Sequence, residues 1–161
     1  MSNNDIIFID LDGVILDTEK IILNKKEENN TLSWDEFFEC LNWEMVLSNA
    51  SQINDSIEIL KKAQKFRNDL IILTKCHTLK EMQEKVKALR YNREITIPIM
   101  FVPPHVKKSE IYLPMNREIL IDDSQKNIVN WEAAGGIGLL FDNDNNQKYK
   151  RKIRSLEFLL K

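Results

Sequence analysis

The sequence contains little cysteine and little glycine: two cysteines, Cys40 and Cys76, and four glycines in 161 residues. Two cysteines cannot form a disulfide framework, so we expect reduced thiols in a cytoplasmic protein. No Cys–His pair has the spacing of a zinc site. The chain also lacks an apolar segment near the ~20 residues that a membrane-spanning helix needs. Its polar, acidic N-terminus does not resemble a secretory signal.

The sequence has no large excess of charge of either sign, with 23 basic and 25 acidic side chains and a net charge of -2. Near-zero net charge argues against a broad nucleic-acid surface, so we expect no nucleic acid and no membrane among its partners. Basic residues cluster only at 148–154, a pattern typical of a solvated helix face. The length favours one domain with a small insertion, and it leaves the oligomeric state open.

Five short apolar runs are the main structural signal of the sequence, at residues 6–9, 70–73, 95–102, 119–121 and 137–141. They are rich in Ile and Leu without clean alternation, as expected of strands that are covered on both faces. Segments with helical spacing separate them, and the tail from Lys148 has the same spacing. The alternation predicts an α/β fold: a Rossmann-like three-layer α/β/α arrangement with a five-stranded parallel sheet.

Two helical segments carry a capping signal. Thr78-x-x-Glu81 predicts a helix whose apolar stripe is formed by residues 79, 82, 86 and 89. Ser33-x-x-Glu36 begins a second helix inside the segment 18–55, which is too long for an ordinary crossover between strands. We therefore expect a core domain at 1–17 and 56–161, with a small helical cap at 18–55.

Acidic side chains follow two of the predicted strands, at the point where each strand ends. Asp10 and Asp12 follow the first strand, and Asp122 and Asp123 follow the fourth. Ligands of open parallel sheets bind at this edge. Two such charges ~4 Å apart repel by on the order of 4 kcal/mol, so either protons or a cation must offset them. An all-oxygen ligand set suits Mg²⁺, and an acidic site that holds a hard cation is suited to phosphate chemistry.

The same edge carries groups for phosphoryl transfer. One of Asp10 and Asp12 can attack phosphorus and form an aspartyl-phosphate, while the other transfers a proton, because a turn at Gly13 lets both approach one substrate. The second strand ends in Thr74 and Lys75, which offer a hydroxyl, a backbone N–H and a charge to the phosphate. Lys107 and Lys108 are the candidate counter-charges, of which we favour Lys108.

Four of these segments resemble the motifs of the haloacid dehalogenase-like (HAD) superfamily, in the family's order, from Ile6 to about Phe141. The matching segments are Asp10-Leu11-Asp12-Gly13-Val14, Leu73-Thr74, Lys108 and Ile121-Asp122-Asp123. The resemblance implies that Asp10 is the nucleophile and that Asp12 is the general acid/base, with its main-chain carbonyl on Mg²⁺. It implies that Asp122 binds the metal directly, that Asp123 is an additional ligand or lies next to one, and that Thr74 and Lys108 bind phosphate. An aspartate two residues after the nucleophile points to phosphatases rather than dehalogenases.

The predicted function is therefore that of a Mg²⁺-dependent phosphomonoester hydrolase acting on a small phosphorylated metabolite. The segment from Trp34 to Glu44 is similar to the 5′(3′)-deoxyribonucleotidase-like group, which implies a (deoxy)nucleoside monophosphate as substrate. Trp34 and Trp43 can belong to the cap core or line the substrate site, and Asn127 can orient a metal-bound water or face solvent. The alternatives are a receiver-type phosphoacceptor module, a HAD-like protein that binds phosphate without catalysis, and a phosphomutase.

Overall fold

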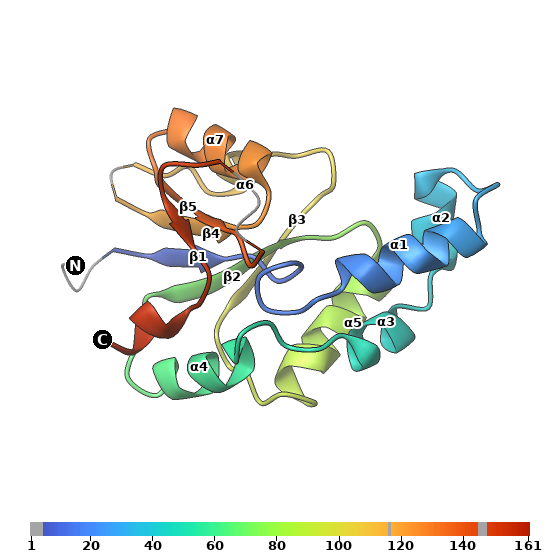
Figure 1. Ribbon diagram of the computed structural model, residues 1–161, viewed down its shortest axis with the longest axis horizontal. Coiled ribbons are helices and arrows are strands. Elements are labelled where there is room, and N and C mark those ends of the chain that lie inside the picture. The colour runs from blue at the N-terminus through green and yellow to red at the C-terminus, as the bar shows by residue number, and fades with distance from the viewer. Residues whose placement is uncertain (1–4, 116, 145–147) are drawn as a thin grey trace.

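The computed structural model describes residues 5–115, 117–144 and 148–161 and contains one parallel sheet (Figure 1). Its strands lie in the order β3-β2-β1-β4-β5-β6. The strands are β1 (Ile7–Ile9), β2 (Leu70–Lys75), β3 (Ile99–Val102), β4 (Ile119–Asp122), β5 (Ile137–Phe141) and β6 (Lys152–Ile153). The helices are α1 (Glu19–Glu28), α2 (Trp34–Cys40), α3 (Trp43–Asn49), α4 (Ser56–Ala63), α5 (Leu79–Arg90), α6 (Lys108–Ile111), α7 (Gln125–Ala133) and a final 3-10 helix (Glu157–Leu160).

Helices cover both faces of the sheet, which confirms the predicted three-layer α/β/α architecture. In Figure 1, α6 and α7 lie on one face, and α4, α5 and the C-terminal helix lie on the other. Trp131 of α7 packs against Phe8 of β1 on the first face, with their ring centroids 5.2 Å apart. On the second face, the buried Leu60 and Leu89 belong to the largest apolar cluster. No helix in the described ranges is long and apolar enough to cross a membrane.

The strand β1 lies at the centre of the sheet and determines where the functional residues meet. It is parallel to β2 on one side and to β4 on the other, with Ile9 in register with Ile72 and with Ile121. The order of the strands reverses at β1, because the chain adds β2 and β3 on one side and β4 to β6 on the other. Such a switch point is where open α/β sheets bind their ligands, at the carboxyl ends of the strands.

The segment after β1 forms the expected helical insertion, with the helices α1, α2 and α3. Ser33 and Glu36 form the predicted capping box at the start of α2. Phe37, Leu41, Trp43 and Val46 form a small apolar cluster of their own. Arg93 of the sheet-bearing part donates hydrogen bonds to the carbonyls of Leu47 (2.9 Å) and Ala50 (3.0 Å), which ties the end of α3 to the larger core. In Figure 1, α1 and α2 project beyond the sheet.

The prediction of five strands and a helical tail is wrong at the C-terminal end. Lys152 and Ile153 pair with Leu140 and Phe141 as a sixth strand, and only a short 3-10 helix follows. The open edge of β5 accounts for the difference, because its N–H groups at Leu140 and Asp142 need acceptors and find them in the tail (2.9 Å each). The third strand is also shorter than expected and begins after Pro98, which has no N–H to give to a strand ladder.

The helix α5 is rotated relative to the predicted apolar stripe. Thr78 accepts a hydrogen bond from the Glu81 N–H, as expected of an N-cap, but the Glu81 carboxylate bonds to His77 and not to the backbone N–H of Thr78. Leu79, the first residue of the expected stripe, is 77% exposed, whereas Glu81 and Lys85 are buried. The helix turns this way because its two charged side chains find partners inside the protein, at the functional site.

Candidate active site

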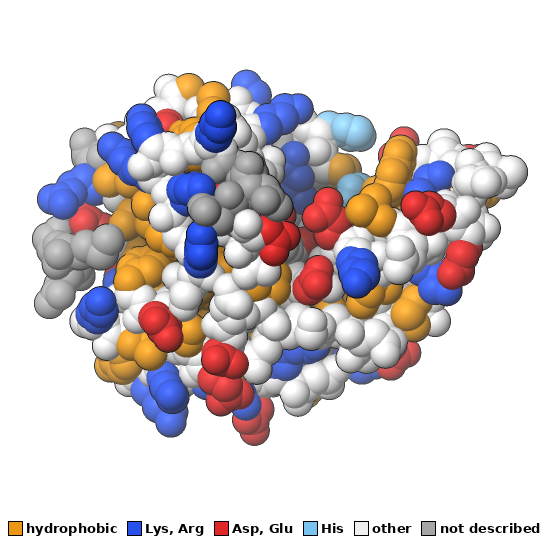
Figure 2. Space-filling model, in the orientation of Figure 1, with side chains coloured by type: hydrophobic (Ala, Val, Ile, Leu, Met, Phe, Trp, Pro, Cys, Tyr) orange, Lys and Arg blue, Asp and Glu red, His pale blue; other side chains and the backbone are white. Residues whose placement is uncertain are grey.

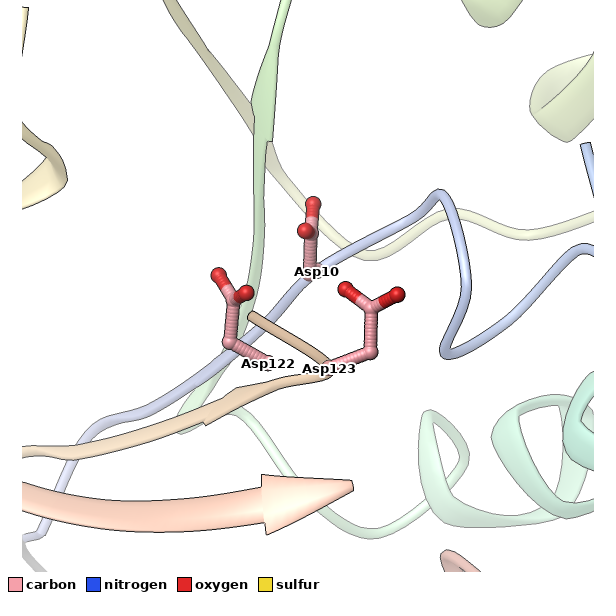
Figure 3. A group of neighbouring side chains, drawn as sticks. All are labelled: Asp10, Asp122 and Asp123. Carbon is pink, nitrogen blue, oxygen red and sulfur yellow. The ribbon is translucent and has the colours of Figure 1, made fainter. Parts of the chain in front are cut away.

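Three carboxylates meet at the carboxyl edge of the sheet. Asp10 follows β1, Asp122 ends β4 and Asp123 is the next residue along the chain. One oxygen from each lies within 4.8 Å of the others, and Figure 3 shows their side chains rising from two neighbouring strands toward a common space. The backbone N–H of Asp10 donates to the carbonyl of Ile121 (2.9 Å), which joins the two strand ends. The sequence predicts that these three carboxylates meet at one edge of the sheet, and in the structure they do.

Lys108 supplies positive charge to this cluster. Its ammonium lies 2.6 Å from Asp122 Oδ2 and 3.0 Å from Asp10 Oδ1, and its side chain is buried. The neighbouring Lys107 is exposed. Asn127 also faces Asp122 and donates from Nδ2 to both carboxylate oxygens (3.0 and 3.1 Å), while Ser124 donates its N–H to Oδ1 (2.9 Å). Asp122 is thus fixed from three directions.

The electrostatics of the cluster indicate a shortage of positive charge. Burial raises the pKa of Asp10 well above its usual value, and Asp122, Asp12 and Asp123 raise it further, although Lys108 opposes them. Burial, together with Asp122 and Glu19, raises the pKa of Asp123 to about 7. One ammonium among three carboxylates does not offset their repulsion. This set of hard oxygen donors fits Mg²⁺, whose charge would supply the missing compensation.

Gly13 permits the close approach of Asp123. Its φ of +76° lies in the left-handed region that favours glycine. A Cβ at this position would lie 2.0 Å from Asp123 Oδ2, well inside contact distance. Any other residue at position 13 would therefore push away the third carboxylate of the cluster.

Asp12 lies beside the cluster and does not share its partners. Oδ1 accepts a hydrogen bond from the Thr18 hydroxyl (2.7 Å), and Oδ2 accepts one from the Lys85 ammonium (2.7 Å). Burial acts to raise the pKa of Asp12, but the Lys85 charge and these two hydrogen bonds hold it below its usual value. Asp12 is thus partnered by cations and hydroxyls, while Asp10 two residues earlier faces carboxylates.

The two residues at the end of β2 have different environments. Thr74 is fully buried, and its hydroxyl lies 3.4 Å from Asp12 Oδ2 and 3.2 Å from Lys85 Nζ. Lys75 lies at the cavity and donates from Nζ to the carbonyl of Pro104 (3.1 Å). Both are near Asp12, so the structure brings the end of β2 to the site, but the Thr74 hydroxyl is enclosed behind Asp12 and Lys85.

A cavity of about 310 Å³ opens above the carboxylates, between the sheet and the helical insertion. Figure 2 shows acidic side chains gathering next to this hollow. The floor includes Asp10, Asp12 and Asp123, and the opposite wall is aromatic. Phe38 of α2 lies at the centre of this wall and stacks on three rings, those of Trp34 (5.5 Å), Trp43 (5.9 Å) and His77 (3.7 Å).

Several residues of the site were missed by reasoning from sequence. Lys85 and Glu81 were assigned no function, although a Glu–Lys pair four residues apart, shortly after a strand end, was a usable signal. Thr18, Glu19 and Phe38 also line the cavity, and only their place in the insertion could have indicated it. Trp43 lies in the insertion's apolar cluster and also lines the cavity, and Trp34 lines the cavity as well.

The raised pKa of Asp123 predicts how the stability of the metal-free protein depends on pH. Between pH ~4 and ~7 the folded protein retains a proton on Asp123 that the unfolded chain has lost, so this group's contribution to the free energy of unfolding falls as pH rises. We expect the free energy of unfolding of wild type, minus that of Asp123→Asn, to fall by on the order of 3 kcal/mol between these two pH values. Urea unfolding in the presence of a chelator measures it.

The exposed Asp144→Asn, outside the acidic cluster, provides the control for the loss of one carboxylate. A wild-type minus Asp123→Asn difference that stays constant, or that rises with pH, would contradict the assignment of Asp123 to a crowded acidic cluster.

Known proteins resemble this chain in their fold and not in their sequence. No family model and no curated protein matches the chain by sequence. Solved structures do match it: a dehalogenase with a TM-score of 0.65 and 12% identity, covering 99% of this chain and 96% of that one. The HAD-hydrolase YfnB from Bacillus subtilis bound to magnesium matches with a TM-score of 0.66 and 14% identity, covering 96% of each chain.

A third match is the D,D-heptose 1,7-bisphosphate phosphatase from Burkholderia thailandensis, with a TM-score of 0.58 and 11% identity, covering 98% of this chain and 97% of that one. These similarities do not single out the deoxyribonucleotidase-like group. They extend over nearly the whole chain, and they agree with the motif order and the acidic cluster at the switch point. The chain has the fold of the haloacid dehalogenase-like hydrolases.

Proposed function

We propose that this protein is a Mg²⁺-dependent phosphomonoester hydrolase that acts through an aspartyl-phosphate on Asp10. The observation that carries the proposal is the group formed by Asp10, Asp122 and Asp123, with Lys108 bonded to two of its members, at the floor of a cavity large enough for a small metabolite. The HAD-hydrolase from Bacillus subtilis, which shares the fold, was solved with magnesium bound.

In the first half of the reaction, a carboxylate oxygen of Asp10 attacks phosphorus. The bond from phosphorus to the leaving oxygen breaks, and its electron pair passes to that oxygen, which takes a proton from the Asp12 carboxyl group. Asp12 is suited to this exchange because its side chain borders the cavity two residues from Asp10. Lys108 remains beside Asp10 and stabilises negative charge there.

In the second half, water attacks the phosphorus of the aspartyl-phosphate. The water gives a proton to the Asp12 carboxylate, the bond from phosphorus to Asp10 breaks, and inorganic phosphate leaves with Asp10 restored. The Lys85 ammonium and the Thr18 hydroxyl favour the charged form of Asp12, which is the form that accepts this proton. Lys75 lines the cavity and is a candidate to contact phosphoryl oxygens. Thr74 is the second candidate, although its hydroxyl is enclosed behind Asp12 and Lys85.

The metal would be held by Asp10 and Asp122 directly, with the main-chain carbonyl of Asp12, and Asp123 as an additional ligand or its neighbour. When bound, Mg²⁺ supplies positive charge to the phosphoryl oxygens and to the carboxylates. Asn127 and Lys108, which bond to Asp122, and Gly13, which lets Asp123 approach, support this assignment.

We propose further that residues 18–55 act as a cap over the core formed by 1–17 and 56–161, and that the substrate carries a flat ring, as a (deoxy)nucleoside monophosphate does. The cavity wall contributed by this segment supports the idea. Trp34 is 49% exposed and, like Phe38, lines the cavity opposite the carboxylates. Stacking on such rings suits a planar base.

The proposed activity predicts hydrolysis of 4-nitrophenyl phosphate in the presence of Mg²⁺ and its loss on addition of a chelator. Asp10→Asn should lower kcat by more than about 1,000-fold, because an amide oxygen is a far poorer nucleophile than a carboxylate. Release of 4-nitrophenol measures the rate, and circular dichroism establishes that the variant is folded.

No turnover with any divalent cation, or equal rates for wild type and Asp10→Asn, would contradict the proposal. A receiver-type module would instead become stably phosphorylated by a small phosphodonor without turnover, and a phosphomutase would return the phosphoryl group to a second position of the substrate.

The aromatic wall predicts selectivity for substrates with a ring. Trp34→Ala should raise KM for a nucleoside monophosphate by about 5-fold, since one stacking contact contributes about 1 kcal/mol, and should leave KM for glycerol phosphate unchanged. The exposed Tyr91→Ala, away from the cavity, is the matched control. Steady-state kinetics with both substrates provide the test, and an equal rise for both would count against a ring-binding wall.

A further inference from the structure

Lys85 is a charged residue enclosed in the protein beside the catalytic floor. Its side chain has no exposed surface, and its ammonium lies 2.7 Å from Asp12 Oδ2, 2.7 Å from Glu81 Oε1 and 2.7 Å from the carbonyl of Lys75. These acceptors match the three N–H donors of an ammonium group. A lysine is almost never fully buried unless it is paired, and the pairing of charges in a protein interior adds little net stability. The arrangement therefore calls for another explanation.

The contacts of Lys85 do not resemble those of an ordinary helical ion pair. On the same helix, Lys87 pairs with Glu84 (3.6 Å) and with Glu44 of α3 (2.6 Å), but its side chain is 44% exposed. Lys85 has no exposed surface, and it bonds to Asp12, a residue of another segment, and to the end of β2. Glu81 is held in turn by the backbone N–H of His77 (2.7 Å), so the pair has a fixed position.

Asp12 is held from two sides by this arrangement. Thr18 of the insertion bonds one carboxylate oxygen, and Lys85 of the core bonds the other. Asp10, Asp122 and Asp123 make up the three-carboxylate cluster, of which Asp12 is not a member. Because Asp12 is only two residues from Asp10 and its loop turns at Gly13, a carboxylate without these partners would be drawn to any cation bound there.

We propose that Lys85 is a positioning residue that holds the Asp12 carboxylate on the leaving-group side of the site and out of the metal-binding cluster. This inference rests on the proposed hydrolase function, in which Asp12 transfers the proton. Without Lys85, Asp12 becomes a fourth acidic ligand of the cation and is lost as a proton donor to the leaving group.

The test uses a variant that removes both charges of the buried pair, Lys85→Met with Glu81→Gln, so that no carboxylate is left without its partner. The control removes a pair nearer the surface of the same helix, Lys87→Met with Glu84→Gln, whose side chains are 44% and 20% exposed. It also removes the lysine partner of Glu44, which is 65% exposed. A leaving group of high pKa needs a proton and one of low pKa does not. Because water attack in the second half also uses Asp12, the comparison is made on kcat/KM, which reports the steps up to release of the leaving group. We expect kcat/KM for phenyl phosphate to fall ~100-fold and kcat/KM for 2,4-dinitrophenyl phosphate to change less than ~3-fold. The control should match wild type with both substrates.

Equal losses with the two substrates would overturn the proposal, because general damage to the site lowers both rates. A second comparison asks whether Lys85 acts through Asp12. Adding the Lys85→Met, Glu81→Gln pair to Asp12→Asn should cause no further loss with phenyl phosphate, since residues that act as a unit are not additive. A further loss equal to that seen in the wild-type background would also overturn it.

The final arm needs no substrate. Calorimetric titration with Mg²⁺ should show several-fold tighter binding to the buried-pair variant than to wild type, and Asp12→Asn in that variant should reverse the gain. Because the variant loses one positive and one negative charge, a change in net charge does not produce this effect. An unchanged affinity overturns the proposal. Tighter binding supports Lys85 in this role even if wild type hydrolyses no phosphate ester, a result that contradicts the proposed function alone.

Discussion

Mutual repulsion among carboxylates at the carboxyl ends of β1 and β4 is the constraint on which the rest of the site depends. Unit charges ~4 Å apart repel by on the order of 4 kcal/mol at an effective dielectric near 20, and three of them share one small space. The surrounding groups relieve part of this. Lys108 bonds to Asp10 and Asp122, while burial, together with the remaining repulsion, raises the pKa values of Asp10 and Asp123.

The fold maintains this unfavourable arrangement because strong elements hold each carboxylate. β1 and β4 are neighbouring, fully buried strands whose backbones hydrogen-bond up to Asp10, so their ends cannot separate. Gly13 lets the loop pass against Asp123 where any side chain would collide. The cost of assembling the acidic groups is thus offset by the burial of Ile and Leu in the sheet, far from the chemistry.

A second buried group of charged side chains lies next to the three carboxylates. Lys85 and Glu81 bring a lysine and a carboxylate into the interior, and the lysine pairs with Asp12. Two aspartates two residues apart therefore experience opposite surroundings: the pKa of Asp10 is raised and that of Asp12 is lowered. Burial and the neighbouring carboxylates raise the first, whereas the Lys85 charge and the hydrogen bonds from Lys85 and Thr18 lower the second against the effect of burial.

The strand-end residues could be predicted from the sequence, because the ends of parallel strands meet at one edge and Asp10 and Asp122 follow obvious apolar runs. Lys85 was missed although its spacing from Glu81 was a signal, because the apolar residues of α5 suggested that another face of the helix is buried. The sixth strand was missed for a similar reason: Lys152 and Ile153 pair because β5 leaves an edge open, which the spacing of apolar residues in the tail does not report.

Anomalous diffraction from crystals soaked in Mn²⁺ is the most direct test of the central claim. We expect one strong peak per chain, about 2 Å from carboxylate oxygens of both Asp10 and Asp122, with the Lys108 ammonium still bonded to Asp122. A cation bound elsewhere, or a cluster in which Asp10 and Asp122 turn away from each other and bind none, would contradict it.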